Sequence, residues 1–275
     1  MEDHITAEIQ DHYRRVAEEA QRPETFGGCC AGPGAASLEC PACGPAQTGG
    51  LPAAAVRSSR GIGDPLVFAA LRPGERVLDL GCGGGLDVLR ASLQVGPSGW
   101  VYGLDLTPEM VALARQNVQE MGATNVTILQ GDLMAIPLPA ASVDVVISNC
   151  VLNLVPDKVQ ALGEAWRALR PGGRLALVDV VIDPDFAGLP LTEETIRATL
   201  GWTGCLGGAL TTAQYRTALT TVGFTDLHLR ILRRFTLDDL APPVLRPLAR
   251  LAPTALRDLA NRVTSTAILA RRPAA

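Results

Sequence analysis

The sequence predicts an α/β fold in which a mostly parallel sheet is covered by helices on both faces. Short apolar stretches alternate with longer stretches of helical periodicity between residues 76 and 180. The first apolar stretch, VLDL, runs directly into a glycine-rich turn. Strands that alternate with helices at this spacing pair in parallel, because each helix returns the chain to the same end of the sheet.

The elements follow one another in a regular order along the chain. An amphipathic helix is predicted for 3–21, and an irregular segment rich in Gly, Pro, Ala and Cys for 22–60. LTPEM marks a helix start, with Thr107 as N-cap and Pro108 in the first turn. Strands are predicted at 76–80, 100–104, 126–130, 143–148, 174–180, 227–231 and, as a closing edge strand, 265–270. Helices are predicted from about residue 86, and at 107–121, 157–169, 191–200, 213–222 and, broken by prolines, 237–262.

These elements divide the chain into three parts. We expect an N-terminal helix and Cys-rich arm at 1–60, a core domain at 61–185, and a C-terminal α+β extension at 186–275. The extension would cover a substrate site and complete a sheet of seven strands. A chain of 275 residues with 47% apolar and 19% charged residues can bury one large core of this kind.

Charge and hydropathy exclude several classes of partner. The net charge is −4 and the arginines are scattered, so we expect no nucleic-acid partner. No apolar run approaches the roughly 18 residues of a membrane span, and the acidic start does not read as a signal peptide. We therefore expect a cytoplasmic monomer that has no membrane partner.

The glycine turn and three acids suggest a cofactor site. VLDLGCGGG places Asp79 two residues before Gly81, and the third glycine of a nicotinamide fingerprint would fall on Leu86. Asp105 ends the second strand, where a carboxylate can accept from ribose hydroxyls, and Asp132 follows the third strand. A Rossmann-like domain for another nucleotide is the alternative interpretation, and Cys82 inside the turn is interpreted as structural.

The order of these motifs over 76–182 resembles the class I S-adenosylmethionine-dependent methyltransferases. The resemblance implies a Rossmann-like fold with S-adenosylmethionine as cofactor. It places the methionine part of the cofactor near the first strand, the ribose on the second and the adenine after the third. The residues implied are Asp79, Gly81 and Gly83 for methionine, Asp105 and Leu106 for ribose, Asp132 and Leu133 for adenine, and Asn149 also in the cofactor site.

Two cysteines lie at positions suited to substrate binding. Cys150, in SNCVLNL, follows the fourth strand at the carboxyl edge of the sheet, where open α/β sheets bind their ligands. Cys205, in GCLGGAL, is flanked by glycines and is expected in a turn. Each alone would be read as a small apolar side chain.

Together with HYRRVAEEA and the adjacent pair Cys29–Cys30 in GGCC, these motifs resemble the arsenite methyltransferase family across nearly the whole chain. The resemblance implies methylation of trivalent arsenic for detoxification. Arsenic would be the substrate, bound by Cys150, Cys205 and a thiol of the arm, and glutathione or a thioredoxin system would serve as reductant.

The chemistry of arsenic agrees with this resemblance. Trivalent arsenic is a soft centre that prefers thiolates, and three sulfurs leave its lone pair on the open side. In-line attack on a sulfonium methyl needs alignment, worth about 7–11 kcal/mol, and no strong general base. No histidine belongs to a motif, and we expect all three, His4, His12 and His228, to be surface residues.

One position departs from the family pattern. The family usually has a cysteine between two glycines before the first strand, and here SRGIGDP has Ile62. Cys40 and Cys43, in CPAC, are possible substitutes. CPAC is also half of a structural zinc site, but no second ligand pair or histidine lies nearby, and a disordered arm with incidental cysteines is a further alternative.

Two other functions therefore stay open at this point. One is methylation of an organic small molecule, with Cys150 and Cys205 merely packed. The other is a thiol-rich metalloid-binding protein without turnover. The sequence leaves undecided the number of methyl transfers, the choice between arsenite and methylarsenite, and which arm cysteine binds.

Overall fold

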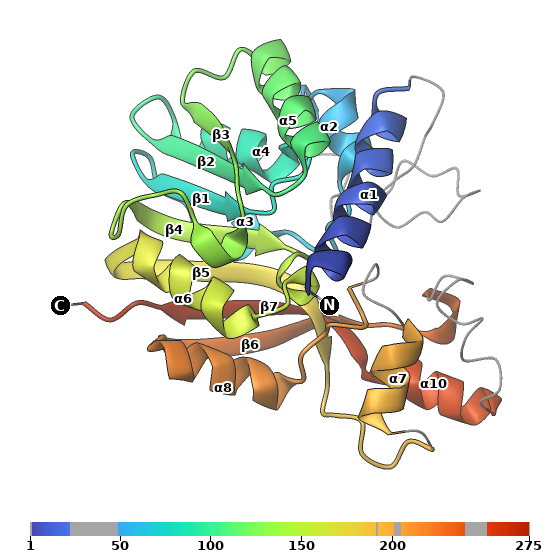
Figure 1. Ribbon diagram of the computed structural model, residues 1–275. Helices are drawn as coiled ribbons and strands as arrows, with labels where there is room; N and C mark the ends of the chain where they lie inside the picture. The colour runs from blue at the N-terminus through green and yellow to red at the C-terminus, as the bar shows by residue number, and fades with distance from the viewer. Residues whose placement is uncertain (1, 23–48, 191, 201–204, 240–251, 275) are drawn as a thin grey trace.

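A seven-stranded sheet forms the centre of the computed structural model, which describes residues 2–22, 49–190, 192–200, 205–239 and 252–274. The strand order is β3-β2-β1-β4-β5-β7-β6, with the first five strands parallel and β7 antiparallel to both neighbours. The mostly parallel α/β fold predicted from the sequence is confirmed (Figure 1). The strands are β1 (Arg76–Leu80), β2 (Trp100–Asp105), β3 (Val126–Gln130), β4 (Val143–Asn149), β5 (Leu169–Ile182), β6 (Thr225–Arg234) and β7 (Val263–Arg271).

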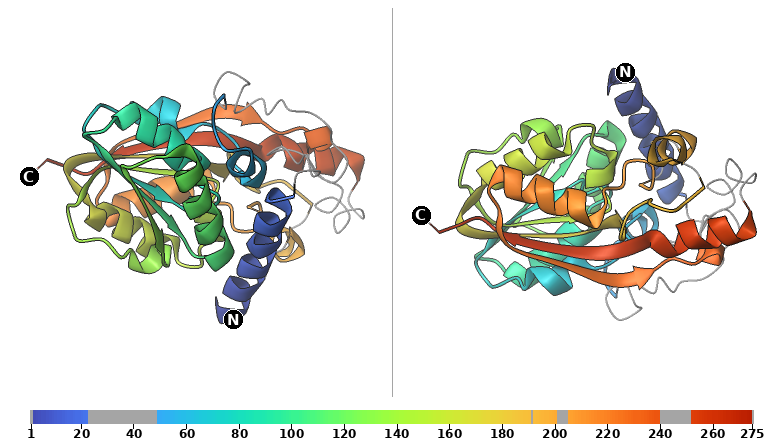
Figure 2. Two further views of the ribbon diagram at one scale, coloured as in Figure 1. Left: turned by 90° about the horizontal axis from the view of Figure 1, so that it is seen from above. Right: turned by 90° about the horizontal axis from the view of Figure 1, so that it is seen from below.

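Helices cover both faces of the sheet, as Figure 2 shows. On one face, α6 (Lys158–Ala168) and α8 (Thr212–Val222) pack on a cluster that contains Leu78 of β1. On the other, α3 (Pro65–Ala69), α4 (Leu86–Val95) and α5 (Pro108–Met121) pack on a cluster that contains Val77. Because successive strand residues point to opposite faces, the adjacent Val77 and Leu78 of β1 serve the two cores.

Two helices near the N-terminus pack beside α5. α1 (Glu2–Ala20) contacts α5 through Val16, Ala17 and Ala20, which lie against Met110 and Leu113. α2 (Ala53–Ser58) lies within the segment predicted to be irregular, so that prediction is wrong for these residues. The run AAAVRS has good helix formers, and its buried Ala55 packs on Leu86 and Leu89 of α4.

The last strand is not at the edge of the sheet, and this part of the prediction is wrong. β7 lies between β5 and β6, and β6 forms the edge. Although they are polar, Thr264, Ser265 and Thr266 are buried. Thr264 Oγ1 donates to Val181 O at 2.8 Å and Ser265 Oγ to Ile62 O at 2.9 Å, so burial leaves these hydroxyls satisfied.

The C-terminal third carries the remaining elements. α7 spans Glu193–Leu200, and α10 spans Pro253–Arg262. The helix predicted over 237–262 is present as a short 3-10 turn at Leu237–Asp239 and as α10, while 240–251 lie outside the described residues. None of the helices described here has the length and apolar character needed to cross a membrane.

Candidate active site

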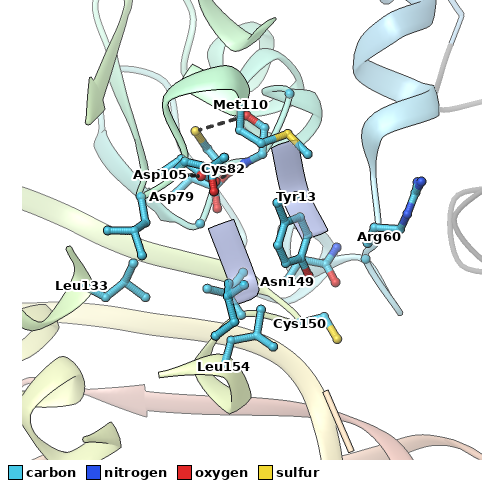
Figure 3. Close-up of a pocket in the computed structure, with 18 of the residues that line it drawn as sticks. Tyr13, Arg60, Asp79, Cys82, Asp105, Met110, Leu133, Asn149, Cys150 and Leu154 are labelled. Carbon is cyan, nitrogen blue, oxygen red and sulfur yellow. Dashed lines mark hydrogen bonds between the residues drawn. The ribbon is translucent and has the colours of Figure 1, made fainter. Parts of the chain in front are cut away.

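A cavity of about 1060 Å³, open to solvent at its mouth, lies at the carboxyl ends of β1, β2 and β4. It is the place where the predicted cofactor residues and one predicted substrate residue come together (Figure 3). From the predicted set, the lining contains Asp79, Gly81, Gly83, Asp105, Leu106, Asp132, Leu133, Asn149 and Cys150.

The glycine turn between β1 and α4 forms the floor of this cavity. The backbone N–H groups of Gly81 and Cys82 both donate to Leu104 O, at 2.8 and 2.9 Å, which ties the end of β1 to β2. Gly81 and Gly83 have φ of 69° and 50°. A Cβ on Gly81 would collide with the Val151 side chain, whereas one on Gly83 would have no atom within 4 Å. The turn is therefore pressed against Val151 and leaves open space beside Gly83.

Asp105 joins this turn to the start of α5. Its Oδ2 accepts from Gly83 N at 2.8 Å and its Oδ1 from Thr107 N at 2.9 Å. Thr107 is the N-cap residue as predicted, but its side chain makes no capping bond, and Asp105 binds that turn instead. Burial raises the pKa of Asp105, and hydrogen bonds from Thr107, Gly83 and Leu106 act in the opposite direction.

The cavity is rich in carboxylates. Four aspartates line it, and Arg60 is the one cationic side chain among the described lining residues. Burial, then Asp87 and Asp105, raises the pKa of Asp79 well above its usual range. Asp87, which sequence reasoning missed, forms ion pairs with Arg90 and also has a pKa raised by burial. Such a lining favours a ligand that carries positive charge.

Asp132 and Leu133 mark the end of the cavity beyond β2. Asp132 Oδ1 accepts from Met134 N at 2.8 Å and so caps the short 3-10 turn Leu133–Ala135. Leu133 is buried and lines the cavity together with Leu106 and Met134. This end therefore offers apolar side chains and one carboxylate.

Asn149 is the last residue of β4 and binds the loop before α3. Its Oδ1 accepts from Ile62 N at 3.0 Å, and its Nδ2 donates to Gly63 O at 2.8 Å and to Asp87 Oδ2 at 3.1 Å. A Cβ on Gly61 would collide with this amide, so the loop approaches closely because it has glycine there.

Helix α1 supplies a wall of the cavity that the sequence prediction did not include. Thr6, Ile9 and Tyr13 line it, and Tyr13 projects inward beside Asn149 (Figure 3). Ile9 and Tyr13 are four residues apart and so share one face of the predicted amphipathic helix. That spacing fits a face that packs on the core as well as one that lines a cavity. Burial raises the pKa of the Tyr13 phenol well above its usual range, and the nearby thiols of Cys205 and Cys150 raise it further.

The two predicted substrate cysteines meet at the rim of the cavity. The Sγ atoms of Cys150 and Cys205 are 2.7 Å apart although the residues are 55 positions apart in the chain, and both are free cysteines. Cys205 lies in a turn, as predicted. The hydrogen bond with the Cys205 thiol raises the pKa of Cys150 well above its usual range, and burial raises it further. The Cys150 sulfur is therefore a neutral thiol at pH 7 in the absence of a ligand.

Ile62 packs on the same buried apolar group as the two cysteines. It packs with Cys205 against the buried group that contains Cys150, Val180 and Ile182. The backbone of Ile62 is held from both ends, by Asn149 at its N–H and by Ser265 at its carbonyl. An aliphatic side chain therefore belongs to this buried group at the position where the family pattern has a thiol.

The third described cysteine, Cys82, lies in the glycine turn and is one of the residues that line the cavity. Cys82 is buried among apolar side chains, and burial raises its pKa well above the usual range, which agrees with a structural role. Cys29, Cys30, Cys40 and Cys43 lie outside the described residues. His228 is exposed as expected, but His12 is half-buried, and burial lowers its pKa, so the surface prediction is wrong for His12. The side chain of His4 is not described.

A search for metal ligands finds no candidate site within the described ranges. No group of three His, Cys, Asp or Glu side chains there is arranged to hold a metal ion. Because CPAC lies outside those ranges, the zinc alternative for that segment stays untested.

Comparison with known proteins agrees with the fold and with the arsenic motifs. A model of the methyltransferase domain matches residues 71–223. An arsenite methyltransferase from Halobacterium salinarum is 43% identical over 169 residues, which are 62% of this chain and 42% of that protein. One from Aquipseudomonas alcaligenes is 40% identical over 179 residues, 62% of this chain and 50% of that protein. The chain thus spans about half the length of these curated relatives, or less.

A solved structure gives the same indication. The crystal structure of an arsenic(III) S-adenosylmethionine methyltransferase from Chlamydomonas reinhardtii superposes with a TM-score of 0.55 at 31% identity. The match covers 73% of this chain and 64% of that one. The predicted resemblance to arsenite methyltransferases is confirmed as a similarity. The family model, which spans more than half of the chain, decides its membership: this chain belongs to the methyltransferase domain family.

Proposed function

We propose that this protein transfers a methyl group from S-adenosylmethionine to trivalent arsenic held by Cys150 and Cys205. The observation that carries the proposal is the approach of two free thiols to 2.7 Å at the rim of a carboxylate-lined cavity. Vicinal thiols bind a soft trivalent centre far better than an oxygen or nitrogen pair would. The similarity to arsenite methyltransferases supports the same substrate.

The cavity fits the cofactor in its chemistry. When bound, the cofactor supplies an electrophilic methyl group on a positively charged sulfonium. The open space beside Gly83 admits a ligand against the backbone, and the aspartates favour its positive charge. Asp105 would hold the ribose hydroxyls and Asp79 the methionine end. Leu106, Asp132 and Leu133 would enclose the adenine, and Asn149 would hold the loop that closes the site.

The thiols bind the substrate without a base. Each As–OH group leaves as water with the proton of the thiol that replaces it, so the raised pKa of Cys150 does not prevent binding. Two As–S bonds then fix the arsenic atom, and its lone pair is free to face the methyl group. The protein contributes alignment and exclusion of water, which suits a site without a general base.

Ile62 bears on which arsenical is preferred. A singly methylated arsenic needs two thiolates to fill its remaining bonds, and Cys150 and Cys205 supply two. Inorganic arsenite needs three, and position 62, where the family pattern has a thiol, carries an aliphatic side chain in the same buried group. We therefore assign methylarsenite as the substrate of the pair alone, with arsenite dependent on a thiol from the 29–43 segment.

Separation of the arsenic species after reaction tests the proposal. The protein is incubated with S-adenosylmethionine, glutathione or a thioredoxin system as reductant, and either arsenite or methylarsenite. Cys150→Ser and Cys205→Ser should each abolish methylation of both arsenicals, whereas Asp258→Ala, which changes an exposed acid of α10, is the control that keeps it. Methylation that survives in both rim variants, or transfer to an organic acceptor alone, would contradict the arsenic proposal.

A further inference from the structure

A buried carboxylate beneath the thiol pair has no part in the function proposed so far. Asp179, in the middle of β5, is 1% exposed. Its Oδ1 accepts from Asn153 Nδ2 and from Val180 N, both at 2.8 Å, and its Oδ2 accepts from Tyr215 Oη at 2.8 Å. Three donors therefore converge on one inaccessible carboxylate, and each donor comes from a different element.

One branch of this network fixes the Cys150 loop. Asn153 is fully buried, and its Nδ2 also donates to Val180 O at 2.7 Å. It belongs to the 3-10 turn Leu152–Leu154, which follows Cys150 directly. Cys150 itself has φ of 60°, and its N–H donates to Val178 O at 2.8 Å. The left-handed backbone of Cys150 is thus held to β5 on both sides of the residue.

The other branch fixes the Cys205 loop. Tyr215 is fully buried in α8, the helix that follows the Cys205 turn. Between them, Ile182 N donates to Leu210 O at 3.0 Å, and Thr211 forms a capping box at the start of α8. The hydrogen bond from the Tyr215 hydroxyl to Asp179 therefore holds α8 against β5. It thereby also limits the position of the loop that carries Cys205.

We propose that Asp179 is a positioning residue that sets the separation of the Cys150 and Cys205 sulfur atoms by fastening both of their loops to β5. This inference rests on the proposed function, in which the pair binds arsenic. Asp179 touches neither substrate nor cofactor in this role. It holds the two loops in a fixed position relative to each other, although their cysteines are 55 residues apart in the chain.

A thiol–disulfide equilibrium measures that separation without arsenic or cofactor. In a background with Cys29, Cys30, Cys40 and Cys43 replaced by serine, the two rim thiols react with oxidised glutathione to give the Cys150–Cys205 disulfide and two reduced glutathiones. The equilibrium constant rises with the fraction of time in which the two sulfurs are aligned. The disulfide fraction is read by alkylation and mass spectrometry.

Asp179→Leu removes both branches and should lower this constant at least tenfold. Tyr215→Phe removes one hydroxyl from a buried ring of the same shape and should lower it about threefold or more. Asp179→Asn should stay within threefold of the parent, because the amide oxygen still accepts from Asn153 and its NH₂ faces the Tyr215 oxygen. The control is Asp144→Leu, a buried carboxylate at the amino end of β4 that accepts from Arg76 N, and it should change nothing beyond twofold.

Unchanged constants in Asp179→Leu and Tyr215→Phe would overturn the inference. An equal loss in Asp144→Leu would also overturn it, because the effect would then be one of general stability. If Asp179→Leu does not fold, Tyr215→Phe decides alone. Since the assay contains no arsenic, failure of methylation in the parent protein would refute the proposed function and leave this result intact.

Discussion

Single carboxylates decide the chemistry of this site, and Asp105 bears most directly on cofactor binding. Its two oxygens hold Gly83 and Thr107 while facing the cavity. We predict that Asp105→Ala weakens S-adenosylmethionine binding at least tenfold, about 1.4 kcal/mol. Calorimetry on the folded variant measures the effect.

The control for this change is Asp258→Ala, which removes an exposed acid of α10 and should leave cofactor affinity as it is. Circular dichroism establishes that both variants keep the fold. Equal affinity in Asp105→Ala and the parent protein would remove Asp105 from the cofactor site.

Asp179 should also make stability depend on pH. Burial raises its pKa to about 7, above the value of about 3.9 in an unfolded chain. The native state therefore binds this proton more tightly. The resulting stabilisation is present below pH 4 and is lost as pH rises through 7. We predict that, relative to Asp179→Asn, the parent protein loses up to about 1.4 kcal/mol of unfolding free energy per pH unit from pH 5 to 7.

Urea unfolding at several pH values measures this difference. Nearby Lys158 has a pKa lowered by burial to about 8, so it titrates above the window. A difference between parent and variant that is flat from pH 5 to 7 would show that Asp179 stays ionised throughout.

Site residues that belong to a local sequence motif could be predicted. Residues whose role depends on contacts with distant segments could not. Gly81, Gly83 and Asp105 were found because a strand, a turn and a second strand end have local sequence signals. Asn153, Asp179 and Tyr215 carry no such signal, since each looks ordinary until the fold brings it to the others. Cys150 and Cys205 were paired by resemblance, because their spacing alone predicts no contact.

At the scale of elements, α1 combines packing with a place in the cavity wall. Val16 is 4% exposed and packs on Met110 and Leu113 of α5. We predict that Val16→Asp detaches α1, because a carboxylate cannot be buried there without a partner. Loss of the wall formed by Ile9 and Tyr13 should then weaken cofactor binding more than fivefold.

Ala7→Asp is the matched control, because it places the same charge on the exposed side of the same helix. Cofactor affinity by calorimetry and α1 protection by hydrogen exchange are compared in both variants. An unprotected α1 with normal affinity would show that the helix is dispensable for the cavity.

The sequence located most strands of the sheet to within a few residues but gave less about their arrangement. β7 was found within its observed range, yet its place between β5 and β6 depends on pairing between distant segments. The hydroxyls of its buried Thr264 and Ser265 are satisfied by carbonyls that only the fold supplies. α2 was missed because six helical residues at the end of a Gly- and Pro-rich segment give too short a period to detect.

At the scale of the whole molecule, the substrate site that we propose depends on segments from all parts of the chain. The core supplies Cys150, the C-terminal extension supplies Cys205, and Ile62 comes from the loop before α3. The core alone would supply the cofactor side of the cavity and only one of the two thiols, Cys150. The C-terminal extension that we propose for 186–275 is therefore part of the reaction site as well as of the sheet.

The number of thiols available should decide which arsenical reacts. With carbon at position 62, the described part of the site offers Cys150 and Cys205 to arsenic. We predict that replacing Cys29, Cys30, Cys40 and Cys43 together by serine cripples methylation of arsenite at least tenfold and keeps at least half of the methylarsenite rate. Serine is nearly the same size but offers a hard oxygen, so the change tests the softness of the ligand.

Ile62→Cys provides the reciprocal change, because it places a thiol at the position where the family pattern has one. In the background that lacks the four arm thiols, it should restore arsenite methylation and leave the methylarsenite rate within twofold. Initial rates for the two substrates, measured side by side, give the comparison. Equal loss on both substrates in the serine variant would mean that the arm serves another purpose, such as closing the site. Full activity on both substrates would mean that Cys150 and Cys205 suffice for arsenite even with isoleucine at position 62. The requirement for three thiolates would then be wrong.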